Sequence, residues 1–290
     1  MVRLYSGAST RMSIGRFLQQ AAAGNAGGFS WSGDVSTATF VQNFSISSQE
    51  TGVGGVSFKD DGTKMYVVGF IGDDVNEYNL STEWDISTAS YVQNFSFSSQ
   101  DTNVNGIFFK DDGTKMYMAG GSGANIYEYN LSTAWDVSTA SYVQNFNVNS
   151  SSIPLASRET NPYGPFIGDD GTKMYVSGTY NDSIHQYDLS TGWDISTASF
   201  VRTLDLVSYD TNVRTSFFSG DGLKMYFTGT QGDDVNEFDL STAWDISTAS
   251  FVQNKSLGLG DHNGLFFKSD GTKMYIADSN ADVIKEYDLD

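Results

Sequence analysis

Short apolar runs separated by turn-forming pairs recur along this chain, and residues 54–97 form one complete unit. Apolar runs at 55–58 and 64–69 flank Asp61-Gly62. An Asp-Gly pair between two such runs is a strong hairpin signal, because glycine adopts the positive φ of a tight turn. Two further runs follow at 75–80 and 91–97. The pattern predicts four antiparallel strands in each unit.

The apolar positions within these runs do not alternate cleanly with polar ones. A strand that is packed on both faces carries apolar side chains on both. We therefore expect sheets whose two faces both contact neighbouring sheets, with the recurrent methionines and tyrosines in the core rather than at a cofactor.

The unit repeats five times. The hexamer Asp-Gly-Thr-Lys-Met-Tyr recurs with one variant, Asp-Gly-Leu-Lys-Met-Tyr, and a second marker, Trp-Asp-Ile/Val-Ser-Thr, follows most copies. A period near 50 residues that is built from short strands is typical of a β-propeller with one blade per repeat. The hexamers begin at Asp61, Asp112, Asp170, Asp221 and Asp270, and the second marker begins at Trp84, Trp135, Trp193 and Trp244.

The order of the strands predicts how the ring closes. Residues 39–44 resemble a fourth strand but precede any first strand, whereas the last repeat ends after its third strand at 283–287. The N-terminal strand should complete the last blade and so remove exposed sheet edges. The sequence therefore predicts an all-β fold: a single five-bladed β-propeller of four-stranded antiparallel blades over residues 30–290, with a short N-terminal arm over residues 1–29.

Composition excludes several chemistries. The 290 residues include no cysteine and two histidines, which argues against disulfides, cysteine nucleophiles and multi-histidine metal sites. No apolar run approaches the length of a membrane span, so no membrane insertion is expected. The net charge of −19 argues against nucleic acid as a partner, because affinity for nucleic acid depends on neutralising phosphates.

The basic residues are unevenly placed. Residues 1–33 contain three arginines and no acid, which gives +3, and the remainder carries 13 basic and 35 acidic residues, which gives −22. We interpret residues 1–29 as an arm that docks on another protein, joined through a glycine-rich hinge at 24–28; the alternative is a leader without fixed structure. The expected docking residues are Arg3, Arg11, Arg16, Phe17 and Leu18.

The two faces of the predicted propeller differ in sequence variation. Loops between strands one and two, and between strands three and four, are nearly identical in every repeat, whereas loops on the opposite face vary. Binding residues are commonly found on loops of a rigid scaffold, so we assign recognition to the variable face. The connection that enters the third blade is seven residues longer and contains all three prolines. The expected ligand-binding residues are Arg158, Tyr163, Tyr180, Arg214 and His262.

An acidic residue also recurs shortly before each innermost strand. A ring of such carboxylates around the channel mouth would suit Ca²⁺, the one cofactor considered. The interpretation that we favour is a turn motif, in which each carboxylate accepts hydrogen bonds from nearby backbone amides. The residues are Glu50, Asp101, Glu159, Asp210 and Asp261.

The repeat resembles those of known propellers. The core Asp-Gly-x-Lys-Met-Tyr-Val resembles the Pro-Asp-Gly-x-x-Leu-Tyr-Val repeat of the YVTN and TolB-type families, with Asp, Ser or Gly where those families often have proline. The fuller unit, which ends in Leu-Ser-Thr-x-Trp-Asp-Ile-Ser-Thr-Ala-Ser-Tyr-Val-Gln-Asn-Phe, resembles repeat proteins of marine bacteriophages over residues 34–290. The resemblance implies the fold and is weakly specific for activity.

We interpret the chain as a non-enzymatic bacteriophage virion structural protein, either a capsid decoration or a tail- or fibre-associated protein. It would dock on other virion proteins through the arm and display the propeller for host-surface or glycan contact. A glycosidase needs distinct carboxylates from different blades, and no repeat shows an odd extra carboxylate on its innermost strand. One alternative is a free, extracellular, lectin-like carbohydrate-binding propeller; the second is a propeller hydrolase, either a glycosidase or a lactonase.

Overall fold

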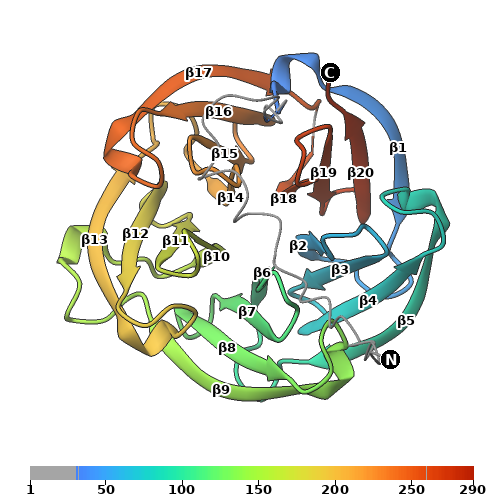
Figure 1. Ribbon diagram of the computed structural model, residues 1–290, viewed down its shortest axis with the longest axis horizontal. Coiled ribbons are helices and arrows are strands. Elements are labelled where there is room, and N and C mark those ends of the chain that lie inside the picture. The colour runs from blue at the N-terminus through green and yellow to red at the C-terminus, as the bar shows by residue number, and fades with distance from the viewer. Residues whose placement is uncertain (1–30, 32, 259) are drawn as a thin grey trace, which may run out of the picture.

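The computed structural model describes residues 31, 33–258 and 260–290 as five four-stranded antiparallel sheets around a central axis (Figure 1). The prediction of a five-bladed all-β propeller is confirmed. In each blade the first strand of the repeat lies nearest the axis and the fourth forms the outer wall. Within the described residues, no helix is long and apolar enough to cross a membrane.

The strands of each blade run outward in chain order, except in the last blade, where β1 is outermost. The blades are β2 (Val53–Phe58), β3 (Lys64–Gly69), β4 (Asp74–Leu80) and β5 (Ala89–Ser96); β6 (Val104–Phe109), β7 (Lys115–Gly120), β8 (Asn125–Leu131) and β9 (Ala140–Asn147); β10 (Pro162–Gly168), β11 (Lys173–Gly178), β12 (Ser183–Leu189) and β13 (Ala198–Asp205); β14 (Val213–Phe218), β15 (Lys224–Gly229), β16 (Asp234–Leu240) and β17 (Ala249–Ser256); and β18 (His262–Phe267), β19 (Lys273–Asp278), β20 (Val283–Asp288) and β1 (Thr39–Ser45).

Short 3-10 helices precede the outer strands, and one more lies in the long connection into the third blade. They are η2 (Val35–Thr37), η3 (Ile86–Thr88), η4 (Val137–Thr139), η5 (Leu155–Ser157), η6 (Ile195–Thr197) and η7 (Ile246–Thr248).

The N-terminal strand closes the ring. Strand β1 pairs antiparallel with β20, in a register from Thr39 opposite Asp288 to Ser45 opposite Val283. The backbone N–H of Asp290 also donates to Thr37 Oγ1 at 3.1 Å. The pairing predicted from the strand count is therefore confirmed, and the last blade has no missing strand.

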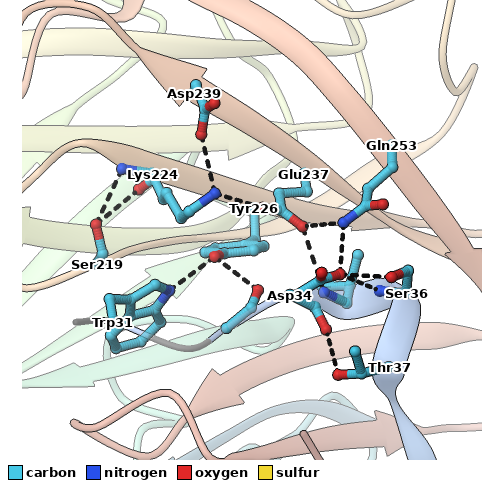
Figure 2. Close-up of polar contacts among 12 residues, drawn as sticks. Trp31, Asp34, Ser36, Thr37, Ser219, Lys224, Tyr226, Glu237, Asp239 and Gln253 are labelled. Atoms are coloured by element: carbon cyan, nitrogen blue, oxygen red, sulfur yellow. Dashed lines mark hydrogen bonds and ion pairs between the residues drawn. The ribbon is translucent and has the colours of Figure 1, made fainter. Parts of the chain in front are cut away.

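A polar latch joins each blade to the next. Asp85 caps η3 by accepting the Ser87 N–H at 3.0 Å, and it also accepts from Gln42 Nε2 of the neighbouring blade at 2.8 Å. Gln42 in turn donates to Glu286 Oε2 at 2.9 Å. The same latch closes the ring where Asp34 accepts from Gln253, as Figure 2 shows.

Burial follows the prediction for strands that are packed on both faces. Every residue of β2 is buried, and in β3 all but the first are. The outer strand β5, by contrast, is mostly exposed, with half-buried positions between exposed ones. The core is therefore made of the inner three strands of each blade and the contacts between blades.

Candidate functional site

A cavity of about 520 Å³ lies on the propeller axis, at the end of the innermost strands where the Asp-Gly turns lie. Its wall is predominantly aromatic, and we call it the aromatic funnel. The cavity is on the face of the repeated loops, opposite the variable face to which the sequence assigned recognition. Its aromatic lining is Trp31, Phe58, Trp84, Phe108, Phe109, Trp135, Phe166, Trp193, Phe217, Phe218, Trp244, Phe266 and Phe267.

Four of the tryptophans are held in a strained backbone conformation. Trp84 has a φ of +63°, and the equivalent residues in the next three blades have values of +64° to +65°. A left-handed conformation costs a non-glycine residue about 1–2 kcal/mol. The Trp84 carbonyl accepts a hydrogen bond from Tyr275 Oη at 2.6 Å, and its ring lies against Gly62, where an added Cβ would be 2.4 Å away. Such strain clusters at functional sites, and these contacts make the wall rigid.

Trp31 supplies the fifth tryptophan of the wall. Its Nε1 donates to Tyr226 Oη at 2.7 Å, and that hydroxyl donates to the Gly33 carbonyl at 2.8 Å (Figure 2). The ring stacks on Phe217 with centroids 6.2 Å apart. Trp31 precedes Asp34 by three residues, whereas the other four tryptophans directly precede their aspartates, so comparison of the repeats did not reveal it.

The funnel has an asymmetric acidic rim. Asp60, Asp111 and Asp169 occupy the same turn position in three consecutive blades, and Gly220 and Ser269 occupy it in the other two. At this position the carboxylates are therefore confined to three consecutive blades; Asp170 and Asp221, at the next position along the turn, also line the funnel. This asymmetry arises in the hairpin turns, one residue before each Asp-Gly or equivalent pair, whereas the sequence argument against an enzyme concerned carboxylates on the innermost strands.

The electrostatic environment of the rim raises the pKa values of two of its carboxyl groups. Asp60 is solvent-accessible at the funnel mouth, but the surrounding protein desolvates it and the carboxylates of Asp111 and Asp61 repel it; together they raise its pKa to about 7. Desolvation, followed by the charge of Asp112, also raises the pKa of Asp111. Two like-charged groups at one site resist simultaneous ionisation. The pair can therefore hold one proton near neutral pH.

On the variable face, the structure brings together two of the five expected ligand-binding residues. Arg214 in β14 lies over the ring of Tyr163 in β10, with Cζ 4.1 Å from the centroid. His262 is fully buried, and neither ring nitrogen has a partner among the described residues. Arg158 donates from Nε to the Ile153 carbonyl at 3.1 Å, and Tyr180 is 63% exposed. Neither Arg158 nor Tyr180 contacts the Arg214–Tyr163 pair through a hydrogen bond or a ring interaction within the described residues, so the five do not form one site.

The acidic residues before the innermost strands cap loops. Glu50 Oε1 accepts the Gly52 N–H at 2.8 Å, and Asp101, Glu159 and Asp210 likewise accept backbone N–H groups two residues ahead. This is the geometry that the turn interpretation predicts. No group of three or more possible metal-ligating side chains occurs among the described residues. Calcium binding stays an untested prediction.

The fifth member of this set differs from the others. Asp261 lies one residue before its innermost strand, whereas the other four acids lie three residues before theirs. In the last blade Asp278 replaces the glycine that ends the second strand elsewhere, and its Oδ1 accepts the Asn280 N–H at 3.0 Å. Its Oδ2 pairs with Lys285 at 2.6 Å. A carboxylate on a neighbouring strand thus takes over the capping role. The expected docking residues of the arm lie outside the described residues.

Comparisons with known proteins found similarity only at the level of solved structures. No family model and no curated protein sequence matches the chain. A periplasmic gluconolactonase from Pseudomonas aeruginosa is 14% identical, with a TM-score of 0.48 and coverage of 81% of this chain and 65% of that one. A provisionally assigned 6-phosphogluconolactonase from Bacteroides uniformis is 15% identical, with a TM-score of 0.46 and coverage of 78% and 64%. A protein of unknown function from Desulfotomaculum acetoxidans is 14% identical, with a TM-score of 0.49 and coverage of 78% and 79%.

The chain spans less than two thirds of the length of both lactonase-named structures. At these identities the likeness concerns the fold alone. The interpretation as a non-enzymatic virion structural protein is corrected on this point: two of the three structures are named as lactonases and none is described as a virion protein, so nothing in the comparisons supports it. The asymmetric rim also removes the argument on which an enzyme was excluded.

Proposed function

We propose that this propeller is a hydrolase of a cyclic sugar-derived substrate, with the aromatic funnel as its substrate site and Asp60 and Asp111 as its acid–base pair. The observation that supports the proposal is the asymmetry of the rim, in which one turn position carries a carboxyl group in three of the five blades around an aromatic cavity. Flat aromatic walls suit the apolar faces of a sugar ring, and their hydrophobic area favours binding of a partly apolar ligand.

The two carboxyl groups are assigned different tasks. At neutral pH Asp60 is partly protonated, because its pKa is raised to about 7, and it can donate that proton to the leaving oxygen. Asp111 is assigned the role of base that accepts a proton from water. In a lactone, the water oxygen forms a bond to the carbonyl carbon, the ring C–O bond breaks, and the leaving oxygen takes the Asp60 proton. The product is the hydroxy acid, and transfer of the proton from Asp111 to Asp60 resets the pair.

The test is turnover above the uncatalysed rate. Aldonolactones and disaccharides form the two arms of the substrate panel, since in both the leaving group is an alkoxide that needs a proton from an acid at the breaking C–O bond. With the substrate that turns over, Asp60→Asn and Asp111→Asn should each lower kcat by roughly 10²–10⁴-fold. Ser269→Ala, at the same turn position without a carboxyl, is the matched control and should retain activity. Absence of turnover on every substrate, or full activity in both carboxamide variants, would contradict the proposal.

A further inference from the structure

A second candidate site lies on the axis below the funnel. Arg214 is the sole lysine or arginine on the five innermost strands of the described chain. Its guanidinium stacks on Tyr163, but it makes no hydrogen bond or ion pair with the described residues, and its Nε is buried without a partner. Leaving a half-buried cation without a counter-charge is costly. The arginine therefore has unused capacity to bind an anion.

Arg214 belongs to a layer of residues at equivalent positions. In each innermost strand the register with the second strand is interrupted just after the first residue, and the interruption in β14 spans two residues. Bulges re-aim side chains, often beside binding sites. The funnel lining ends at the next position along these strands, which includes Thr215. We call the layer the bulge ring; its members are Gly54, Asn105, Tyr163, Arg214 and Asn263.

The bulge ring also contains acceptors that lack donors. Asn105 Nδ2 donates to the Pro162 carbonyl at 2.9 Å, and Asn263 Nδ2 donates to the Val53 carbonyl at 3.0 Å. These bonds fix the two amides, while both Oδ1 atoms are buried without a hydrogen-bond partner. Buried acceptors of this kind are usually satisfied by water or by a ligand. One layer thus combines a fixed cationic donor with two unsatisfied acceptors.

We propose that the bulge ring binds a small hydroxycarboxylate. The carboxylate would pair with the planar guanidinium of Arg214, which can donate two parallel hydrogen bonds. Hydroxyl groups of the ligand would donate to Asn105 Oδ1 and Asn263 Oδ1. With a chain charge of −19, non-specific attraction of anions is weak, so selectivity must come from this one arginine. The proposal does not depend on the hydrolase assignment, because it concerns binding without turnover.

The test uses sodium gluconate as the probe and thermal unfolding as the readout. A ligand that binds the folded state raises the melting temperature in a saturable, concentration-dependent way. We expect this for the wild type with gluconate, a smaller shift with acetate, and none with glucose or with sodium chloride of equal ionic strength. Arg214→Gln should abolish the gluconate shift, whereas Arg158→Gln, which removes the same charge from the variable face, should keep it.

Two further variants keep the test decisive if Arg214→Gln does not fold. Arg214→Lys retains the charge but loses the planar fork and should weaken gluconate binding at least about 10-fold. Asn105→Ala should weaken gluconate binding and leave acetate binding unchanged. The proposal is overturned if gluconate gives no saturable shift, if sodium chloride gives the same shift, or if the Arg214 variants respond as the wild type does.

Discussion

Single residues at the turn tips give the five similar blades different chemistry. Asp60, Asp111 and Asp169 carry carboxyl groups where Gly220 and Ser269 carry none, although all five turns connect equivalent strands. Desolvation by the surrounding protein and repulsion from neighbouring carboxylates then raise the pKa values of Asp60 and Asp111. The chemical character of the funnel rim is therefore set by a position that contributes little to the fold itself.

The raised pKa of Asp60 has a measurable effect on stability. Its folded pKa is about 7, against an ordinary value of 3.8, so between about pH 4 and pH 7 the folded protein holds a proton that the unfolded chain has released. The free energy of unfolding should therefore fall as the pH rises through this window. Asp60→Asn removes this loss and should melt a few degrees higher than the wild type at pH 8, with the difference shrinking towards pH 4.

The neighbouring Asp61 provides the control for this prediction. Burial opposes ionisation of Asp61, but hydrogen bonds from Lys59 and Thr63 outweigh burial and hold its pKa below the ordinary value. Asp61→Asn should therefore melt lower than the wild type at neutral pH, and the difference should disappear in acid. Scanning calorimetry of both variants from pH 2 to pH 8 checks the two opposite signs. Parallel profiles for wild type and Asp60→Asn would show that Asp60 titrates normally.

At the scale of elements, the blades are joined by latches that exist in two versions. Glu77 in β4 is 1% exposed and forms an ion pair with Lys64. It also accepts hydrogen bonds from Gln93 Nε2 at 3.0 Å and from the Val137 N–H, in the connection that enters the outer strand of the next blade, at 3.2 Å. In the third blade the glutamate is replaced by Gln186 and the glutamine by Arg202. The lysine there pairs instead with an aspartate of the same blade, and Arg202 pairs with an aspartate of the next connection. The negative charge of the glutamate is thus replaced by that of an aspartate two residues further along the strand, and the added arginine makes the third-blade latch one unit more positive.

This difference predicts what happens when the latch residues of the third blade are introduced into the first blade. Glu77→Gln alone leaves Lys64 without its buried partner and should cost roughly 1.5–3 kcal/mol, the range for hydrogen bonds to charged groups. Adding Asn79→Asp and Gln93→Arg reproduces the third-blade arrangement and should recover most of that loss. Urea denaturation of the single and triple variants measures both free-energy changes, provided that the m value, the slope of unfolding free energy against urea concentration, is the same for each. A triple variant no more stable than the single one would show that the latches are not interchangeable.

At the scale of the whole molecule, closure of the ring is the feature on which the other contacts depend. The outermost strand of the last blade comes from the opposite end of the chain (Figure 1). The funnel is complete only when Trp31 joins the other four tryptophans. A blade that lacks β1 would present the edge of β20, and an unpaired edge is a template for aggregation.

Removing residues 30–46 should therefore convert a monomeric propeller into an aggregating species. A chain that begins at residue 31 keeps β1 and the latch at Asp34, and it serves as the control that should remain monomeric. Size-exclusion chromatography with light scattering compares the two. A monomeric, cooperatively unfolding protein without residues 30–46 would mean that β1 contributes little to closure.

The sequence by itself determined the blades and their number. The Asp-Gly turns, the apolar runs and the position of residues 39–44 ahead of the first complete repeat dictate five sheets and the pairing of β1 with β20. These signals are local or periodic, and strand pairing within a hairpin follows from turn chemistry and the hydrophobic pattern. The latch aspartates likewise stand at a fixed sequence distance before the outer strands, each as the N-cap of a 3-10 helix.

Only the tertiary structure decided which side chains lie close together near the propeller axis. Asp60 and Asp111 are 51 positions apart in sequence, and Tyr163 and Arg214 are equally distant; the packing of consecutive blades around the axis brings each pair together. Trp31 joins the funnel wall from an irregular position, and Asp278 takes over a capping role from another strand. The physical reason is that a repeat sequence specifies each blade through short-range interactions, whereas the pKa of Asp60 and the unpaired state of Arg214 depend on desolvation and on charges supplied by other blades.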